Sequence, residues 1–404
     1  MQPSTKRVTL GLGAAVGGTL LAKTLGWRLK RLWRVMHLFD EDQIVENFLN
    51  MAQSFDISTV RKSADPYHFN EGERIALPAH FSFNGKEYNS AEWMQHTGTN
   101  GLLILKNDQI VYENYFQGHN ADTPHISWSV AKSFVSALFG IALERHLVRS
   151  IEETVTDYLP ELVGTGYDNV RIKDVLQMSS GVGFDEDYGT FGSDINRFGR
   201  VIAIGGSFAA FAASLKNERQ PGTYLHYVSI DTQVLAMILM RATGRSVTEL
   251  LEQWLWQPLG MEHDAYWIVD RKGVEMALGG LNATLRDYAK FGRLYLHNGN
   301  WNGKQIVPAA WVQASITPDA PHLQPGENHL SDTDRGYGLQ WWIPDNADGE
   351  FMAIGIYNQF IYVSLKDDLV IVKQSANHHF TDPDALSSDE SVAFFRAIAA
   401  SLAD

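Results

Sequence analysis

Ser129 and Lys132 place a hydroxyl and an amine three residues apart in the stretch HISWSVAKSFVSALFG, which runs from His125 to Gly140. The stretch predicts a buried helix because it is rich in apolar residues, and residues three apart lie on one helical face. A serine hydroxyl attacks a carbonyl carbon poorly until a base removes its proton. A lysine in a partly apolar pocket can be neutral enough to act as that base. The pair therefore predicts a nucleophilic serine with a lysine base.

The S-x-x-K spacing alone is weak evidence. A chain with this serine and lysine content is expected to contain roughly one such motif by chance. Ser129 could instead cap a helix whose Lys132 is solvated. The chain holds one S-x-x-K, so the features that follow it must decide between the two interpretations.

A tyrosine in the sequence His226-Tyr227-Val228-Ser229 is a candidate proton relay. A departing amine or alkoxide needs a proton, and a tyrosine hydroxyl can carry it from the lysine. Tyr227 follows the turn residues Pro221 and Gly222 and precedes an apolar helix predicted from Ile230 to Arg241, so its side chain could point from a loop into a cleft. The alternative is a tyrosine that only packs.

Two predicted hairpins supply a sheet to position these residues. In TNGLLILKNDQIVYENYF, from Thr99, two β-rich runs flank the turn residues Asn107 and Asp108. Residues 360–365 and 369–373 repeat the pattern, and an amphipathic helix begins at Ser388 or Asp389. The pattern favours an α+β fold, in which an antiparallel β-sheet is flanked by N- and C-terminal helices.

The rest of the chain divides by composition. Residues 41–98 form a lead-in arm, with helical spacing only up to Ser54 and polar, irregular sequence beyond it. Residues 99–404 form the main domain, into which a mainly helical subdomain of about 144–334 is inserted. With 404 residues and 45% hydrophobic content, the chain can bury an enzyme-sized core.

Charge and cysteine content exclude several functions. The net charge of -14 argues against nucleic acid as a partner, because phosphate binding requires a basic face. The chain has no cysteine, which excludes disulfides, thiol nucleophiles and cysteine metal sites. His378, His379, Asp382 and Asp384 lie on a polar loop, and we interpret them as solvated side chains rather than metal ligands.

Residues 1–40 differ from the remainder. An apolar, glycine-rich run from Val8 to Ala22 is flanked by basic residues and followed by Trp27 and Trp33. This pattern predicts a signal anchor or interfacial helix, and hence a membrane-anchored or exported protein, although a soluble helix in a cytoplasmic protein stays open. The glycines also resemble a dinucleotide loop, but a basic stretch stands where an acidic ribose ligand is needed. We therefore expect no cofactor.

Taken in order, the motifs resemble the serine β-lactamase-like family, which includes class C β-lactamases, penicillin-binding proteins, family VIII esterases and 6-aminohexanoate-dimer hydrolases. The resemblance spans about residues 99–373 and is nearest to the dimer-hydrolase branch. It is carried by S-V-A-K at Ser129, L-Q-M-S-S-G-V at Leu176, Y-V-S at Tyr227, Q-P-L-G-M at Gln257 and G-G-L-N-A-T-L-R-D at Gly279. It implies a β-lactamase/transpeptidase-like fold and a serine hydrolase.

The resemblance also assigns roles residue by residue. It implies that Ser129 is the nucleophile, Lys132 its base and Tyr227 the proton relay. The oxyanion hole would be the backbone N–H groups of Ser129 and Ile356. Substrate contacts would come from the family positions that match Tyr188, Ser229, Asn282 and Gly355. The expected substrate is a small amide or ester, cleaved through an acyl-enzyme at Ser129.

Two departures from the family pattern keep other functions open. The family's K-T-G or H-x-G strand motif appears as Ala353-Ile354-Gly355, without the cationic or imidazole side chain that helps hold a β-lactam carboxylate. Ser229 stands where asparagine is common. The alternatives are therefore a non-catalytic scaffold or membrane-associated binding protein, or a D,D-peptidase or β-lactamase. The sequence does not indicate an oligomeric state.

Overall fold

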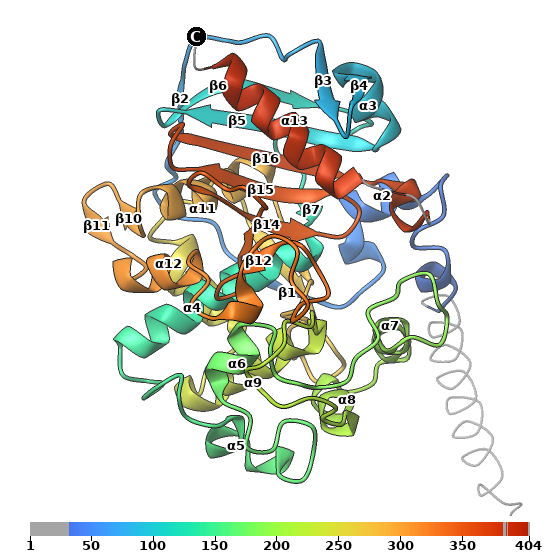
Figure 1. Cartoon of the computed structure of the whole chain (residues 1–404), viewed down its shortest axis with the longest axis vertical. Helices are drawn as coiled ribbons and strands as arrows, with labels where there is room; N and C mark the ends of the chain where they lie inside the picture. Colours follow the sequence, from blue (N-terminus) through green and yellow to red (C-terminus); the bar gives the residue numbers. More distant parts are fainter. Residues whose placement is uncertain (1–31, 383–384, 386, 403–404) are drawn as a thin grey trace, which may run out of the picture.

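The computed structural model describes residues 32–382, 385 and 387–402, and its centre is an eight-stranded sheet (Figure 1). The strand order is β12-β13-β14-β15-β16-β5-β6-β2, and all neighbours are antiparallel except β2 and β6. The sheet's strands are β2 (Asn70–Glu71), β5 (Thr99–Lys106), β6 (Gln109–Tyr115), β12 (Gly336–Tyr337), β13 (Trp342–Ile343), β14 (Glu350–Gly355), β15 (Gln359–Ser364) and β16 (Leu369–Ser375).

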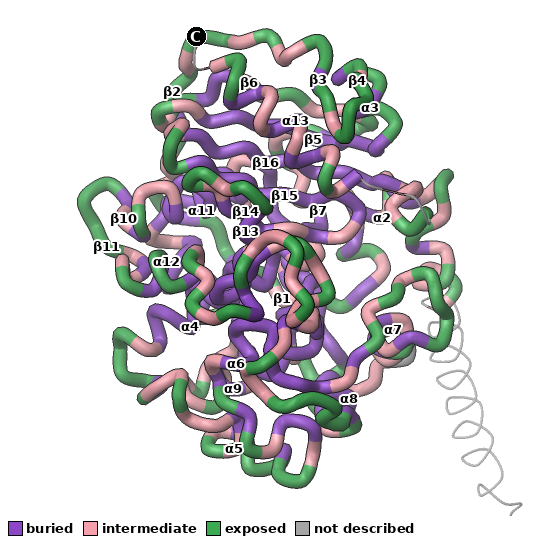
Figure 2. The backbone as a smooth tube through the Cα atoms, in the orientation of Figure 1, coloured by how far each residue is buried: buried purple, intermediate pink, exposed green. Residues whose placement is uncertain are grey.

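Both predicted hairpins are confirmed. Asn107 and Asp108 join β5 to β6 with φ angles of 49° and 62°, a left-handed geometry that these two residue types tolerate better than most. β16 pairs with β15 on one side and with β5 on the other. The two hairpins, far apart in sequence, therefore form the middle of one sheet, and Figure 2 shows these strands as largely buried.

Helices cover both faces of the sheet, as the α+β prediction requires. α13 (Ser387–Ser401) and α3 (Ser90–His96) pack with the hairpin β3 (His80–Phe83) and β4 (Lys86–Asn89) over one face. α11 (Leu285–Leu296) packs against β15, β16 and β5 from the other side. α4 (Ala131–Glu144) lies beyond it, between the sheet and the remaining helices (Figure 1).

α9 (Ser229–Thr243) is the central helix of the remaining helical region. It contacts α4, α6 and α8, and its residues 229–236 are all buried. Around it lie α5 (Val155–Tyr158), α6 (Ile172–Leu176), α7 (Asp194–Ile204), α8 (Phe208–Ser214), α10 (Val247–Leu251) and α12 (Ala309–Ser315), with 3-10 helices at Pro160–Leu162 and Pro321–Leu323 and a π-helix at Glu252–Trp256.

A second, four-stranded antiparallel sheet joins the lead-in arm, residues 41–98, to the main domain. Its order is β1-β8-β9-β7, formed by β1 (Ile57–Val60), β8 (Ala265–Ile268), β9 (Leu281–Ala283) and β7 (His125–Ile126). The stretch after Ser54 is thus less irregular than its polar sequence predicts, because it contributes β1, β2 and the β3–β4 hairpin. β1 and β2 obtain their partners, β8 and β6, from later parts of the chain, whereas β3 and β4 pair with each other. A small hairpin of β10 (Asn300–Trp301) and β11 (Lys304–Gln305) completes the strands.

Most of the predicted membrane-directed segment, residues 1–31, lies outside the described residues. Of the described residues, none belongs to a helix that is long and apolar enough to cross a membrane. The described chain begins with a helical stretch at 32–36 and continues to α2 (Ile44–Leu49) and a 3-10 helix at Met51–Gln53. Phe39 and Phe48 from this region pack on Trp128 and Tyr357, so the beginning of the described chain reaches the residues around Ser129.

Candidate active site

Ser129 lies on a tight turn just before α4 rather than in the first turn of that helix. β7 ends at Ile126, a 3-10 helix covers Trp128–Val130, and α4 begins at Ala131. The prediction of one continuous helix from His125 is therefore wrong at its start. Trp128 has a φ of 47°, which is strained for an aromatic residue and costs about 1–3 kcal/mol. The turn leaves Ser129 partly exposed while α4 is buried.

Packing around the turn holds this strained conformation. The Ser127 backbone N–H and its hydroxyl both donate to the Leu281 carbonyl, each at 3.0 Å. The Trp128 ring lies among the rings of Phe39, Phe48 and Tyr357. Neighbours on several elements fix residues 127 and 128. The fold therefore sets the position of the Ser129 hydroxyl before any substrate binds.

The Lys132 amine lies 2.9 Å from the Ser129 Oγ. It also contacts the Leu278 carbonyl at 2.6 Å and the Ser229 Oγ at 3.2 Å. The side chain is buried at 1% exposure, and this burial lowers its pKa to about 7, although the nearby Glu186 and Asp231 act in the opposite direction. A substantial fraction of the amine is therefore unprotonated at neutral pH, as a general base requires.

Glu186 is a member of the site that sequence reasoning missed. Its carboxylate accepts hydrogen bonds from the Ser229 hydroxyl at 2.5 Å, the Ser229 N–H at 3.1 Å and the Tyr188 hydroxyl at 2.7 Å. The Ser229 hydroxyl, predicted to contact substrate, is thus held between Glu186 and Lys132. In the sequence, Glu186 is one of three consecutive acidic residues, and nothing in the spacing distinguishes it.

Tyr227 lies beside the lysine. Its ring centroid is 5.2 Å from the Lys132 amine and 5.2 Å from the centroid of the Trp342 ring, on which it stacks. Burial, with a contribution from Glu186, raises the pKa of the Tyr227 hydroxyl well above its usual value, and a hydrogen bond with Ser129 acts in the opposite direction. The hydroxyl therefore keeps its proton at neutral pH. It lies next to the serine, where a departing group would need a proton donor.

Gly355 and Ile356 bring the end of β14 against this turn. A side chain on Gly355 would begin only 2.2 Å from the Ser127 carbonyl oxygen, so glycine permits the contact between strand and turn. The glycine is therefore required for this contact, and its predicted role in substrate approach stays a prediction. Of the backbone bonds in turns and loops of the described residues, none uses the Ile356 N–H. That group is available near Ser129.

The structure does not bring Asn282 to the cavity beside Ser129. Asn282 is fully buried on β9, opposite Ile126 and Tyr266, and its side-chain amide donates to the Gly280 carbonyl at 3.0 Å. Tyr188, in contrast, does line that cavity. Among the predicted substrate contacts, Tyr188 thus lies where a substrate could reach it and Asn282 does not.

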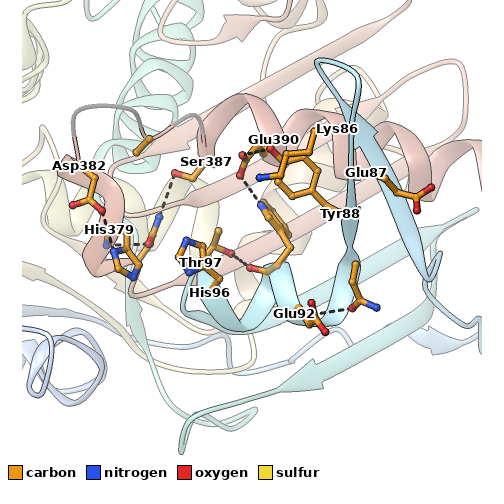
Figure 3. Close-up of a pocket in the computed structure, with 14 residues that line it drawn as sticks. Lys86, Glu87, Tyr88, Glu92, His96, Thr97, His379, Asp382, Ser387 and Glu390 are labelled. Carbon is orange, nitrogen blue, oxygen red and sulfur yellow. Dashed lines mark hydrogen bonds and ion pairs between the residues drawn. The ribbon is translucent and has the colours of Figure 1, made fainter.

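A cavity of about 90 Å³ opens beside Ser129, whereas a larger one, of about 680 Å³, lies elsewhere. The large cavity is bounded by the β3–β4 hairpin, α3 and α13 (Figure 3). Glu390 there accepts from the Tyr88 hydroxyl and the Trp93 N–H, and His379 pairs with Asp382. It shares no lining residue with the smaller cavity. Within the described ranges, no three histidine or acidic residues are placed to hold a metal ion.

Comparison with known proteins agrees with this geometry. The family model described as Beta-lactamase matches residues 94–391, which contain every member of the site above. The chain belongs to the β-lactamase family. Its fold, an antiparallel sheet with helices on both faces, is the β-lactamase/transpeptidase-like fold expected from the motifs. The family and the curated relative described next are hydrolases.

Two relatives of this β-lactamase-family chain carry the same description. The 6-aminohexanoate-dimer hydrolase of Paenarthrobacter ureafaciens is 31% identical over 299 residues, covering 72% of this chain and 75% of the relative. A solved structure from Bacillus anthracis, provisionally assigned as a 6-aminohexanoate-dimer hydrolase, is 26% identical with a TM-score of 0.81, covering 90% of this chain and 96% of that one. A class C β-lactamase, 18% identical with a TM-score of 0.55, covers 77% of this chain and 94% of its own length and shares the fold.

Proposed function

We propose that this protein is a serine hydrolase that cleaves a small amide or ester through an acyl-enzyme at Ser129. One observation carries the proposal: a fully buried lysine amine, with its pKa lowered to about 7, lies 2.9 Å from the hydroxyl of Ser129, a partly exposed serine that lines a cavity. Nucleophile and base are therefore within proton-transfer distance, and the base is partly neutral at working pH.

In the proposed acylation, the Ser129 Oγ attacks the substrate carbonyl carbon while its proton passes to the Lys132 amine. The carbonyl oxygen becomes an oxyanion, which the N–H groups of Ser129 and Ile356 stabilise. Tyr227 then donates its proton to the departing nitrogen or oxygen and recovers one from Lys132. The carbon–nitrogen or carbon–oxygen bond breaks, and the acyl group stays on Ser129.

In the proposed deacylation, a water molecule loses its proton to the neutral lysine and attacks the acyl carbon. The bond to the Ser129 Oγ breaks, and the serine regains a proton as the acid leaves. Ser229 and Glu186 contribute by orientation, because the Ser229 hydroxyl touches the Lys132 amine and is itself held by the Glu186 carboxylate.

Linear amides or esters fit better than β-lactams. The strand motif Ala353-Ile354-Gly355 supplies no cation for a β-lactam carboxylate, and the residues that line the cavity beside Ser129 include no charged side chain. The Paenarthrobacter relative is itself named for hydrolysis of a 6-aminohexanoate dimer. A penicillin adduct in intact-mass spectra would contradict this preference.

A fluorophosphonate probe tests the nucleophile directly. We expect covalent labelling of the wild-type protein and none of Ser129→Ala, with loss of p-nitrophenyl ester turnover in the same variant. Ser133→Ala is the matched control, because Ser133 lies four residues further on, in α4, and its hydroxyl donates to the Gln340 carbonyl. Equal labelling of wild type and Ser129→Ala, or failure to label folded wild type, would overturn the proposal and favour a non-catalytic binding protein.

A further inference from the structure

The small cavity beside Ser129 has an almost wholly apolar lining. Its wall comes from the segment before α2, the Trp128 turn, α7 and the loop before β9. The side chains that line it are Phe39, Trp128, Ser129, Tyr188, Ile195, Asn196, Phe198, Ile202, Met276, Leu278 and Ile356, with Gly199 and Gly279 between them. None of these is charged, so a charged group would lose its hydration here without gaining a partner.

Of the other polar side chains in the wall, Tyr188 and Asn196 are already engaged, and the ring N–H of Trp128 is fully buried without a hydrogen-bond partner. The Tyr188 hydroxyl donates to Glu186 at 2.7 Å. The Asn196 amide donates to the backbone carbonyls of Tyr188 at 3.0 Å and Thr190 at 2.9 Å. Ser129 is thus the polar side chain in the wall that is free to react with a ligand. The rest of the cavity offers apolar contact.

One face of α7 is shaped to leave this space open. Ile195, Gly199 and Ile202 follow one another at helical spacing, and all three line the cavity. A Cβ on Gly199 would meet no atom within 4 Å. Glycine inside a helix is destabilising relative to alanine. At this position it leaves room beside the nucleophile that any larger side chain would fill.

The position of the proton donor indicates which part of a substrate enters the cavity. Ser129 and Ile356, whose N–H groups would hold the carbonyl oxygen, line the cavity, whereas Tyr227 does not. Tyr227 lies on the Trp342 side of the site. A leaving group protonated by Tyr227 would depart on that side. The group that remains bonded to the carbonyl carbon therefore faces the cavity.

We propose that this cavity binds the unbranched, uncharged alkyl chain of an acyl group, and that Gly199 sets how far the chain can reach. The inference rests on the proposed function at Ser129 and deepens it. At about 30 Å³ per water-sized group, the 90 Å³ cavity holds about three such groups. The substrate class is then an ester or amide of an acid of roughly four to six carbons, rather than one with a charged amine at its end.

A series of p-nitrophenyl esters from acetate to decanoate tests the chain length. For wild type, kcat/KM should rise from acetate to a maximum between butanoate and hexanoate, because each methylene that the pocket accommodates adds about 10-fold or more. Gly199→Leu should lower the ratio of hexanoate to acetate kcat/KM by about 10-fold or more. Gly192→Leu is the matched control, because a Cβ there also meets nothing within 4 Å but Gly192 does not line the cavity.

Two outcomes would overturn the inference: a wild-type kcat/KM that falls steadily from acetate, or a hexanoate-to-acetate ratio that Gly199→Leu leaves at the wild-type value. If Gly199→Leu does not fold, Gly199→Ala replaces it and should lower the same ratio by a smaller factor. If wild type hydrolyses no ester, the proposed function fails, and calorimetry with hexanamide and acetamide decides the cavity separately. Tighter binding of hexanamide, weakened by Gly199→Leu, would support it, and equal binding would overturn it.

Discussion

Lys132 and Lys373 are two buried lysines that share three features. Each amine donates to a serine hydroxyl, Lys132 to Ser129 at 2.9 Å and Lys373 to Ser375 at 2.6 Å. Each lies 5.2 Å from the centroid of an aromatic ring, that of Tyr227 for Lys132 and that of Trp93 for Lys373. Burial lowers the pKa of both amines to about 7. A lysine with a depressed pKa beside a serine is therefore not, by itself, an active site.

The two differ in what surrounds the pair. Ser129 is partly exposed beside a cavity, whereas Ser375 is fully buried on β16. Near Lys373 the aromatic residue is Trp93, whose N–H is bonded to Glu390. Burial of a lysine is common to both places. Access for a substrate and a hydroxyl that can pass on a proton occur only beside Lys132, and these are what the proposed chemistry needs.

Exchanging each lysine for methionine should separate the two sites most clearly. Lys132→Met should lower kcat/KM for both amide and ester substrates by about 10³-fold or more, because Ser129 then has no base. Lys373→Met should keep wild-type activity. The pH profile gives an independent measure: kcat/KM should rise with pH through about 7 as Lys132 loses its proton. That rise should remain in Lys373→Met, and its loss there would contradict the assignment of the base.

Tyr227→Phe tests the aromatic residue that distinguishes Lys132 from Lys373. Its expected effect on activity is smaller than that of Lys132→Met. The change keeps the ring next to Lys132 and removes only the hydroxyl. An amide nitrogen must be protonated to leave, whereas p-nitrophenolate leaves as a stable anion. We expect amide turnover to fall by about 10²-fold and p-nitrophenyl ester turnover to fall much less. Amide turnover at the wild-type rate would show that Tyr227, like Trp93, only packs beside its lysine.

The sequence predicted the Lys132 site better than its surroundings because its signals are local. The S-x-x-K spacing and the Tyr227 motif lie within short stretches, and the hairpins around Asn107 and residues 366–368 have local turn residues. Glu186 could not be found in this way, because its role depends on a loop that folds back on Ser229, 43 residues away. The burial of Asn282 on β9 could not be predicted for the same reason, because its strand partners decide which way it faces.

Long-range packing also explains the two other differences. The turn at Trp128 has a left-handed φ because Ser127 is bonded to β9 and the Trp128 ring is enclosed by aromatic residues from distant segments. The helix propensities of residues 125–140 do not indicate these contacts with distant segments. Similarly, β1 and β2 are short polar strands that exist only because β8 and β6 supply partners. Local pattern predicts which elements form, and tertiary contacts decide where they begin.

The smallest expected effect is on stability, because burial of the Lys373 amine destabilises the folded protein. The usual lysine pKa is 10.5, whereas burial lowers that of Lys373 to about 7. Between these values the unfolded chain binds a proton that the folded chain has released, so this lysine makes wild-type stability rise with pH. The penalty is complete below about pH 7. Lys373→Met removes it and should raise the free energy of unfolding by about 1–3 kcal/mol at pH 6.5, with a smaller gain at pH 9.5.

Urea denaturation at the two pH values measures this gain through the unfolding midpoint. Methionine leaves the Ser375 hydroxyl without its lysine partner, which costs about 1 kcal/mol at either pH. The double variant Lys373→Met/Ser375→Ala removes that cost and should be the more stable of the two. A gain of equal size at pH 6.5 and 9.5 would mean that better packing, rather than loss of a buried charge, stabilises the variant. Lys373 would then be an ordinary packed side chain, and its likeness to Lys132 would be limited to geometry.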